Sequence, residues 1–537
     1  MTKRLDTRLI FITGGVISSL GKGITAASLG VILKGKGFSV NIMKFDPYIN
    51  VDSGTMNPFQ HGEVYITKDG AETDLDLGHY ERYISRDMTS LNNVTTGKVY
   101  NAVIEKERRG DYLGNTVQVV PHITDEIKSR IYRLVDRKDD FLICEIGGTV
   151  GDIESLPFLE AIRQIKLEYP ADVMFIHLTL IPFIRSSEEF KTKPTQHSVN
   201  ELRRIGIQPD FLACRSEREI SKELKNKVSL FCSVSVDRVI SVPDQKSIYE
   251  VPLKLEEQDF SVKILEFFNI TQIRKSDYIN SWKKFLNDFF AHEKEITIGI
   301  VGKYVDLTDS YMSIREAVNH ASSYLKVRTG IEWIESADIT EKDRSKLNGM
   351  NGILIPGGFG DRGIEGMIQA AKYARENDIP CFGICLGMQI LIIDIARHVL
   401  EMKGANSTEF DAKTPYKVID IQEHQKKIKD KGGTQRLGHY PCKITKGTRA
   451  HEAYGESLIL ERHRHRFEFN NEFKQRFESA GVIFSGICPE NELVEISEMK
   501  GKGFFLGCQF HPELQSRPLN PHPLFINFIE KILEAKI

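Results

Sequence analysis

A cysteine bracketed by glycines constrains this sequence more than any other feature. The run Gly383-Ile384-Cys385-Leu386-Gly387 follows an apolar stretch, and its small residues permit the sharp strand-to-helix turn that presents a nucleophile at a sheet edge. Far downstream stands His511-Pro512-Glu513. A single cysteine with a distant histidine and carboxylate is typical of a thiolate nucleophile, its base and the group that orients the base. The pattern indicates acyl transfer.

Two further features support that interpretation. The glycine run Pro356-Gly357-Gly358-Phe359-Gly360 follows a strand-like segment, and its amides are suited to hold a developing oxyanion. His511 and Glu513 are two residues apart, so on an extended strand they would point the same way. The alternative is a buried structural cysteine with an exposed histidine, which is the commoner fate of either residue alone. Three coordinated motifs favour the functional interpretation.

Composition limits the partners of the chain. Lysine and arginine number 72 against 74 acidic residues, for a formal net charge of −2, so no overall field favours nucleic acid or membrane. No apolar run approaches the roughly 18 residues of a spanning helix, and no targeting segment is evident at the start. The eight cysteines form no Cys-x-x-Cys pair, which indicates reduced core thiols. We expect a soluble, cytoplasmic protein.

The first half of the sequence has the pattern of a parallel α/β sheet. An apolar run at residues 9–12 leads into glycines, a helical stretch follows at 24–33, and a second apolar run occupies 40–43. Further buried strands are predicted at residues 141–144, 173–176 and 211–214. We expect this domain to span residues 1–270.

The second half repeats the α/β pattern after a connecting helix. Trp282, Phe285, Phe289 and Phe290 lie among polar residues at spacings that predict an amphipathic helix within a linker at 271–295. Strands are then predicted at 296–301, 352–355 and 380–383, in a domain spanning 296–537. The fold class is therefore α/β, with two domains that each contain a largely parallel sheet flanked by helices. The Lys- and Asp-rich stretch 423–433 is the expected exposed loop of the second half.

The first strand leads into a candidate phosphate-binding loop. In Gly14-Gly15-Val16-Ile17-Ser18-Ser19-Leu20-Gly21-Lys22-Gly23, glycines allow backbone N–H groups to face a phosphate, and Lys22 can reach the outer phosphates. Five residues separate Gly15 from Gly21 where the usual P-loop has four, and Gly23 replaces the usual hydroxyl residue. Magnesium would then need ligands elsewhere. The alternative is a tight turn without a ligand.

Suitable oxygen ligands follow in the sequence. Asp74 and Asp76 alternate, which on an extended segment puts both carboxylates on one face, and Glu145 ends a predicted strand. Carboxylates together with phosphate oxygens suit Mg²⁺. Lys44, at the end of the second strand, could add a positive charge to the same site, although a lone lysine is more often a surface residue. The alternative is that the acids are solvated loop ends, but glycine, lysine and acids all at strand ends favour the phosphate site.

A basic run, Arg462-His463-Arg464-His465-Arg466, resembles a metal or nucleic-acid patch at first sight. Its alternation argues against a chelating helix, and a run of five basic residues is usually a solvated face. One arginine acting as a carboxylate clamp fits a small amino-acid substrate better.

Taken together, these motifs resemble those of the CTP synthase family, glutamine-dependent enzymes that aminate UTP. The resemblance covers nearly the whole chain and includes the order of the two domains. It implies a P-loop NTPase-like amidoligase followed by a class I glutamine amidotransferase. The strings that carry it are residues 14–23, Phe45-Asp46-Pro47-Tyr48-Ile49-Asn50-Val51-Asp52, Gln60-His61-Gly62-Glu63, residues 69–82, Glu145-Ile146-Gly147-Gly148-Thr149-Val150-Gly151-Asp152-Ile153-Glu154-Ser155, Lys191-Thr192-Lys193-Pro194-Thr195-Gln196-His197 and Cys385-Leu386-Gly387-Met388-Gln389.

For the second domain, the resemblance implies that Cys385, His511 and Glu513 hydrolyse L-glutamine and that ammonia passes internally to the first domain, with His61 near the point where it enters. The basic run then contributes to a glutamine site. The residues implied to bind glutamine are Gly358, Leu386, Gly387, Met388, Gln389, Glu409 and Arg466.

For the first domain, the resemblance implies that ATP phosphorylates the 4-oxygen of UTP and that ammonia displaces the phosphate in the last step of de novo CTP synthesis. The magnesium ligands implied are Asp76 and Glu145. The ATP residues implied are Ser19, Leu20, Gly21, Lys22, Gly23, Ile24 and Asp76. Those implied for UTP or inhibitory CTP are Ser18, Asp152, Ile153, Glu154, Lys191, Thr192, Lys193, Pro194, Thr195, Gln196 and Lys227.

The resemblance further implies a homotetramer, GTP as an allosteric activator and CTP as a feedback inhibitor. Two alternatives compete with it. The loop also resembles those of dethiobiotin synthetase and cobyrinic acid amide synthases, which lack the strings at 152–154 and 191–196 in this context. The second alternative is a nucleotide-dependent scaffold with a silent amidotransferase domain. The intact Cys385, His511 and Glu513 argue against this alternative.

Overall fold

The computed structural model describes residues 4–535 except 55, 57–61, 304, 306–307 and 422–434. His61 and the loop predicted at 423–433 therefore lie outside the described residues. The residues named for catalysis are all described. Contacts between Cα atoms divide the chain into two compact units. The first contains residues 1–53 and 76–284, and the second contains residues 54–75 and 285–537.

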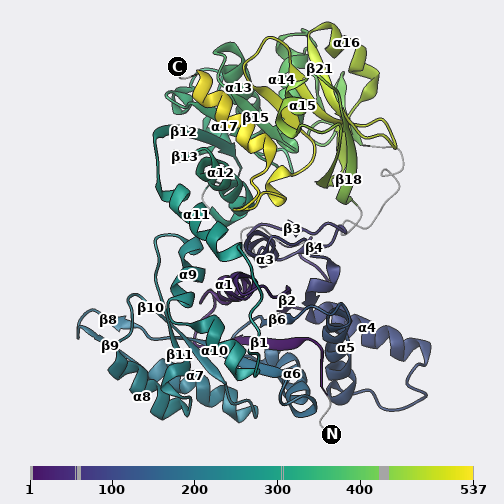
Figure 1. Ribbon diagram of the computed structural model, residues 1–537. Coiled ribbons are helices and arrows are strands. Elements are labelled where there is room, and N and C mark those ends of the chain that lie inside the picture. The colour runs from purple at the N-terminus through teal and green to yellow at the C-terminus, as the bar shows by residue number, and fades with distance from the viewer. Residues whose placement is uncertain are drawn as a thin grey trace. The chain divides into compact units, whose positions relative to one another are not determined.

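The first unit is built on a parallel sheet that follows the predicted alternation of strands and helices. Its seven strands, among the described residues, run in the order β11-β10-β7-β1-β6-β2-β5. Helices α1, α3 and α9 lie over one face and α6 and α7 over the other (Figure 1). The strands are β1 (Arg8–Gly14), β2 (Val40–Asp46), β5 (Asn93–Thr95), β6 (Phe141–Ile146), β7 (Val173–Leu180), β10 (Phe211–Ser216) and β11 (Val239–Pro243), with a small hairpin of β8 (Phe183–Ile184) and β9 (Glu189–Phe190).

The helices of this unit connect the strands and bury their apolar faces on the sheet. Helix α1 carries almost wholly buried small and branched residues, as expected for a helix packed between a sheet and other helices. The helices are α1 (Lys22–Gly35), α3 (Asp76–Ile84), α4 (Thr96–Arg109), α5 (Thr124–Val135), α6 (Leu156–Glu168), α7 (Lys193–Arg204), α8 (Lys222–Cys232), α9 (Val251–Glu256), α10 (Phe260–Phe267) and the start of α11 (Tyr278–Phe290).

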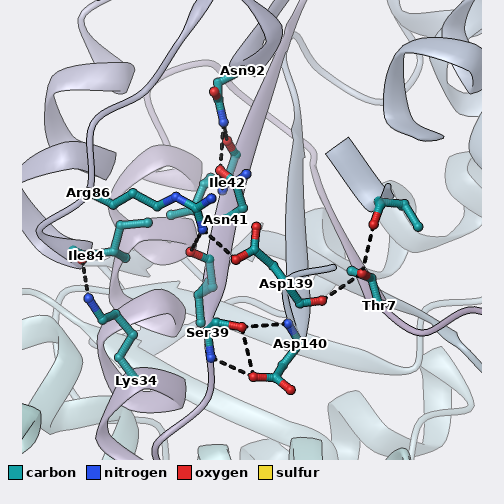
Figure 2. A network of polar contacts seen from close by, with 12 residues as sticks. Thr7, Lys34, Ser39, Asn41, Ile42, Ile84, Arg86, Asn92, Asp139 and Asp140 are labelled. Atoms are coloured by element: carbon teal, nitrogen blue, oxygen red, sulfur yellow. Dashed lines mark hydrogen bonds and ion pairs between the residues drawn. The ribbon is translucent and has the colours of Figure 1, made fainter. Parts of the chain in front are cut away.

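A polar network fixes the amino ends of the central strands (Figure 2). The backbone N–H and hydroxyl of Ser39 donate to Asp140 Oδ2 at 2.8 and 2.9 Å, which joins the residues that precede β2 and β6. Thr7 Oγ1 donates to the carbonyl of Asp139 at 2.7 Å, and Arg86 pairs with Asp139 Oδ1 at 2.6 Å. Because all these strands are parallel, holding their amino ends aligned also brings their carboxyl ends, and the loops that follow, to one edge of the sheet.

The second unit contains a mixed sheet. Nine strands of the described residues run in the order β13-β12-β14-β15-β23-β22-β21-β18-β19; the first five are parallel and the rest pair antiparallel. Helices α13 and α14 pack together, as do α12 and α17. The strands are β12 (Lys294–Gly302), β13 (Val327–Glu335), β14 (Gly352–Ile355), β15 (Cys381–Ile384), β18 (Arg436–Ile444), β19 (Leu458–His465), β21 (Val482–Ile487), β22 (Val494–Met499) and β23 (Phe505–Cys508).

The remaining elements of the second unit are a three-stranded sheet and the covering helices. The helices are α12 (Met312–Tyr324), α13 (Ile364–Glu376), α14 (Leu386–His398), α15 (Arg449–Tyr454), α16 (Lys474–Ser479) and α17 (Pro523–Ala535). The small sheet contains β16 (Asn406–Ser407), β17 (Lys417–Ile421) and β20 (Phe467–Phe469).

One segment from early in the sequence belongs to the second unit. The hairpin of β3 (Tyr65–Ile66) and β4 (Glu72–Thr73) packs against β19 and the short 3₁₀ helix η11 (Pro512–Leu514). Tyr65 OH donates to the carbonyl of Leu514 at 2.8 Å. The local sequence of residues 54–75 carries no sign of this placement, because hydrogen bonds that hold the segment join it to residues more than 380 positions away. The boundary between the units otherwise falls within α11, in the predicted helical linker.

No helix among the described residues is both long enough and apolar enough to cross a bilayer.

Candidate functional site

Cys385 has the backbone geometry of a nucleophile elbow. Its φ is +51° and its ψ is −101°, between the end of β15 and the first residue of α14. The flanking glycines are required by close packing: a Cβ on Gly383 would lie 2.6 Å from the backbone carbon of Gly387, and a Cβ on Gly387 would lie 2.0 Å from the carbonyl oxygen of Ile355. The strained turn predicted from the sequence is therefore present, and side chains at either glycine position would prevent it.

The predicted triad converges on this elbow. His511 Nδ1 and Glu513 Oε1 are 2.7 Å apart. A Cβ on Gly357 would lie 2.9 Å from His511 Cε1 and 3.7 Å from Cys385 Cβ, so both side chains pack against the same glycine. Burial alone would lower the pKa of His511, but Glu513 and Cys385 together raise that pKa well above its ordinary value. The imidazole is thus held protonated beside the thiol, and an imidazolium stabilises a thiolate.

The segment that carries the base is helical, which corrects the expectation of an extended strand. His511 precedes η11 and Glu513 lies within it. The two side chains meet because the carboxylate folds back onto the imidazole in the first turn, whereas strand geometry would have placed them side by side. The predicted contact between His511 and Glu513 is present, although the predicted extended backbone is not.

The glycine run after β14 is anchored by Glu409, which the family resemblance named, and by Lys303, which the sequence did not single out. Lys303 is buried, and its ammonium donates to the carbonyls of Phe359 (3.1 Å) and Gly360. Burial lowers the pKa of Lys303 to about 8, although Glu409 and Asp361 oppose that shift. The N–H of Gly360 in turn donates to Glu409 Oε1 at 2.9 Å. Lys303 was missed because a lysine ending a strand has no distinctive local pattern.

A pocket of about 480 Å³ opens beside Cys385. Its lining includes five of the seven residues predicted to bind glutamine, among them Glu409 and Arg466. Gly387 and Met388 lie deeper in α14; Gly387 packs against Ile355, and Met388 packs against Gly507. The lining residues are Gly358, Phe359, Cys385, Leu386, Gln389, Glu409, Gln435, His465, Arg466 and Phe467.

A second, smaller cavity of about 90 Å³ reaches the triad from another direction. Residues 62–66 of the early hairpin segment line it together with Cys385, His511 and Glu513. Glu63 Oε2 accepts a hydrogen bond from the N–H of Ser313 at 2.9 Å, which holds this segment against the unit. This cavity beside Cys385 is therefore completed by residues that the sequence assigned to the first domain.

The basic run is a strand with two different faces, and this resolves the interpretations left open by the sequence. Arg462 NH1 donates to Tyr65 OH and to the carbonyl of Ile66, both at 3.1 Å, and Arg464 Nε pairs with Glu72 Oε1 at 3.0 Å. His463 and His465, which alternate with these arginines, point to the opposite face of the strand, where both are buried. Arg466 lies at a bend after β19 and lines the pocket. Two arginines thus hold the hairpin and one faces the candidate substrate pocket.

In the first unit, the glycine-rich loop has the strained backbone of a phosphate cradle. Val16, Ser19 and Gly21 have φ values of +87°, +56° and +96°, and α1 begins directly at Lys22. Lys22 Nζ donates to the carbonyl of Gly148 at 2.7 Å. Burial lowers the pKa of Lys22, while Glu145 opposes that shift. Positive-φ residues that precede a helix N-terminus present N–H groups to an anion.

Two of the three predicted acids, Asp76 and Glu145, meet at the same place. Lys44 Nζ pairs with Asp76 Oδ2 and lies 2.9 Å from Glu145 Oε1, so Lys44 belongs to the site and not to the surface. Asp76 is the first residue of α3, which corrects the extended segment predicted for Asp74 and Asp76. Burial would lower the pKa of Lys44, but Asp76 and Glu145 raise it well above its ordinary value.

These residues fit a magnesium ion carried with a nucleotide. Among the described residues, no three His, Cys, Asp or Glu side chains cluster as a metal site by themselves. Mg²⁺ in nucleotide sites uses one or two carboxylates and takes its other ligands from phosphates and water. Asp76 and Glu145 supply two such carboxylates beside Lys22.

The residues predicted for the pyrimidine nucleotide lie on loops and helices that follow the strands. The N–H of Val150 donates to the carbonyl of Gly14 at 2.8 Å, which joins the segment after β6 to the phosphate loop. Asp152 precedes a 3₁₀ turn, and Ile153 is 80 % exposed. Ser18 is exposed in the glycine-rich loop, Lys191 precedes α7, residues 193–196 form its first turn, and Lys227 is exposed on α8.

A buried histidine connects these elements and was not singled out by the sequence. His177 on β7 bridges Thr13 Oγ1 (2.9 Å from Nδ1) and Ser198 Oγ (2.7 Å from Nε2). Burial, assisted by the charge of Lys22, lowers the pKa of His177 to about 3, so the ring is neutral. It links the end of β1, where the phosphate loop begins, to α7.

Comparison with known proteins gives two family matches. Residues 8–270 match the CTP synthase N-terminus, and residues 306–531 match the glutamine amidotransferase class-I family. The chain is 56% identical over 533 residues to a CTP synthase of Caldanaerobacter subterraneus, covering 99% of each chain. It is 53% identical over 532 residues to a CTP synthase of Bacillus subtilis, covering 98% of this chain and 99% of that one.

A solved structure of the glutaminase domain of Trypanosoma brucei CTPS with bound acivicin is 33% identical. The matched region covers 44% of this chain and 94% of the chain in that structure, with a TM-score of 0.42.

Proposed function

The chain belongs to the CTP synthase family, and on that premise we propose that Cys385, His511 and Glu513 release ammonia from glutamine while the loop at residues 14–23 binds ATP. The enzyme converts UTP to CTP with ATP and glutamine. The observation that carries the residue assignment is the Cys385 elbow beside a His511 imidazole, which is held 2.7 Å from Glu513.

In the glutaminase step, the Cys385 thiolate attacks the carboxamide carbon of glutamine. We assign stabilisation of the oxyanion to the N–H of Leu386, at the start of α14, and to that of the neighbouring Gly358. His511 delivers its proton to the departing nitrogen, so that ammonia leaves and a thioester remains on Cys385. Water, deprotonated by the now neutral His511, hydrolyses the thioester to glutamate. Glu513 holds the ring in position throughout.

We assign Arg466 and Glu409 to the amino-acid part of the substrate. Arg466 lines the pocket and can pair with the α-carboxylate, while the Glu409 carboxylate can accept from the α-ammonium. Leu386 and Gln389 line the same pocket. Gly387 and Met388 support the position of α14 from behind the pocket.

In the synthetase step, the γ-phosphoryl group moves to the 4-oxygen of UTP, and ammonia then displaces phosphate from carbon 4. We assign Lys22, the first residue of α1, to the outer phosphates, and the backbone N–H groups of residues 19–24 to the phosphate oxygens. Asp76 and Glu145 would hold Mg²⁺, which neutralises phosphate charge when bound. The segments at 152–154 and 191–196, with Ser18 and Lys227, are assigned to UTP or to CTP as feedback inhibitor.

Regulation, assembly and location follow from the family. We assign GTP as an allosteric activator, CTP as an inhibitor and a homotetramer as the working assembly. Ile49 and Ile153 are both 80 % exposed, which suits contact with another subunit. All eight cysteines are free and buried, which suits a reducing cytoplasm.

The test is direct. Purified protein with UTP, ATP, Mg²⁺ and glutamine should show the ultraviolet absorbance change of CTP formation, with glutamate formed in parallel. Replacement of glutamine by ammonium chloride should preserve CTP formation without glutamate. If CTP forms with neither glutamine nor ammonia, the proposed roles of the first unit are refuted. If CTP forms with ammonia but not with glutamine, the proposed roles of the second unit are refuted.

A further inference from the structure

A buried group of charged and titratable residues lies beside the bend that carries Arg466. Its members are less than a tenth exposed and come from three strands of the large sheet and from β20. The glutaminase chemistry described above uses none of them directly. We call this group the buried relay; it consists of Arg436, His463, His465, Glu468 and Glu495.

The ion pairs of the relay centre on Arg436. Arg436 NH1 lies 2.7 Å from Glu495 Oε1 and 3.5 Å from Glu468 Oε1. Burial raises the pKa of Glu495 to about 7, although Arg436 opposes that shift. Burial and the neighbouring Glu495 raise the pKa of Glu468 well above its ordinary value. Both carboxyl groups are therefore easier to protonate than an exposed glutamate, although a charged guanidinium lies beside them.

The two histidines connect this ion pair to the pocket. His463 Nε2 lies 3.7 Å from Glu495 Oε2, and His463 Nδ1 lies 2.8 Å from His465 Nε2. His465 Nδ1 is 3.3 Å from the carbonyl of Phe467, so this contact spans the bend at Arg466. The same carbonyl accepts from Gln389 Nε2 at 3.2 Å, which ties the bend to α14.

Chemistry fixes the direction of these hydrogen bonds. Burial lowers the pKa of both histidines well below the ordinary value, so each ring carries one proton. The Phe467 carbonyl can only accept, so His465 donates from Nδ1 and accepts at Nε2 from His463. His463 Nε2 is then left as an acceptor that faces Glu495, with Glu495 Oε2 3.7 Å away.

We propose that the buried relay fixes the bend at Arg466 and thereby sets the affinity of the enzyme for glutamine. This inference rests on the proposed role of Arg466. A continuous line of contacts runs from Arg436 through Glu495 and the histidines to the backbone on the far side of the bend. These residues are positioning residues, because they act through Arg466 and not on substrate. His465 also lines the pocket, so the line ends at the site itself.

The relay has a second contact with the site. The backbone carbonyl of Glu495 accepts from the N–H of Gln509 at 2.8 Å, and Gln509 Nε2 lies 3.6 Å from Cys385 Sγ. Gln509 therefore connects the backbone of Glu495 to the side chain of Cys385.

The experiment compares two substitutions at Glu495 in the full-length enzyme. Glu495→Gln keeps the length of the side chain, with an amide N–H that can face His463 and a carbonyl that can face Arg436, so it should bind glutamine with nearly the wild-type KM. Glu495→Met has a similar volume but neither group, and it should raise the glutamine KM about tenfold with kcat changed less than about threefold. Ammonia-dependent CTP formation should be unchanged in both variants.

The controls separate the possible outcomes. Glu490→Gln makes the same chemical change at an exposed position and should leave all constants unchanged. An unchanged KM in Glu495→Met, or equal increases in Glu495→Met and Glu495→Gln, would overturn the proposal. If Glu495→Met fails to fold, Arg436→Lys serves instead: a raised KM with retained kcat is expected, and an unchanged KM would overturn the proposal.

Failure of this inference is distinguishable from failure of the proposed function. Arg466→Lys should raise the glutamine KM if Arg466 binds the carboxylate. An effect of Arg466→Lys without one of Glu495→Met would leave the glutamine site standing and remove only the relay. No effect of Arg466→Lys would remove the role of Arg466 itself.

Discussion

The carboxylate of Asp76 occupies the space into which a side chain at residue 23 would project. A Cβ built on Gly23 would lie 2.1 Å from Asp76 Oδ1. The usual P-loop has a hydroxyl residue here that serves the magnesium ion. In this chain the glycine leaves room for a carboxylate from α3, so the departure from the usual motif and the position of Asp76 have one physical explanation.

Gly23→Ala should therefore damage phosphate transfer. The added methyl group forces Asp76 away from Lys44 and the phosphate loop, and we expect CTP formation to fall roughly a hundredfold or more with either nitrogen source. The glutaminase activity of the second unit should survive. Gly503→Ala is the control, because a Cβ there meets no atom within 4 Å. Equal activities of the two variants would show that Asp76 needs no such space.

Lys22→Ala should stop CTP synthesis with both glutamine and ammonia. Lys22 is the cation that begins α1 at the phosphate loop, and its loss removes charge stabilisation from the transferred phosphoryl group. We expect a loss on the order of a hundredfold or more in ammonia-dependent kcat/KM. Retained ammonia-dependent synthesis would contradict the assigned role.

Cys385→Ala should separate the two nitrogen sources. Without the thiolate no thioester forms, so glutamine-dependent CTP synthesis and glutamate release should both disappear. Ammonia-dependent synthesis should continue at the wild-type rate, because the first unit is unchanged. Simultaneous loss of both activities would argue against two separate sites.

Tyr65→Phe should loosen the hairpin on the second unit. The hydroxyl donates to the Leu514 carbonyl at 2.8 Å and meets Arg462 NH1 at 3.1 Å. Its removal leaves buried partners unsatisfied, at a cost of about 1 to 3 kcal/mol. Hydrogen exchange at residues 65–73 should become faster. Tyr324→Phe, at a side chain that is 64 % exposed, should leave the exchange rates of the hairpin unchanged.

His177 should make the first unit sensitive to acid. Its pKa is about 3 in the folded protein, below the ordinary 6.5. For a group whose pKa is lowered by folding, the stabilising contribution is complete above pH 6.5 and is lost as the pH falls from 6.5 toward 3. The loss from His177 at pH 5.5 is about 1.4 kcal/mol relative to pH 7.5.

The measurement is urea unfolding of the wild type and of His177→Gln at both pH values. The glutamine side chain does not titrate, so the variant should be less stable at pH 7.5 yet lose less stability on acidification. The same pH dependence in both proteins would show that His177 is not the responsible group.

Much of this protein was determined by local sequence. The strands and helices around Lys22, the glycines that flank Cys385, and the partnership of His511 with Glu513 follow from short-range patterns of apolar residues, glycine and spacing. Such patterns work because a backbone turn or a helical period requires particular residues within a few positions. The order of the motifs was also enough to indicate the family.

The tertiary structure decided what lies next to those motifs. It placed the hairpin at residues 65–73 against the strand of the basic run, put Asp76 into the space left by Gly23, and divided alternating arginines and histidines between two environments. It also brought Lys303 to the glycine run. These contacts join residues tens to hundreds of positions apart, and no local period encodes them. They depend on which surfaces meet when the chain closes, and only the folded protein contains that information.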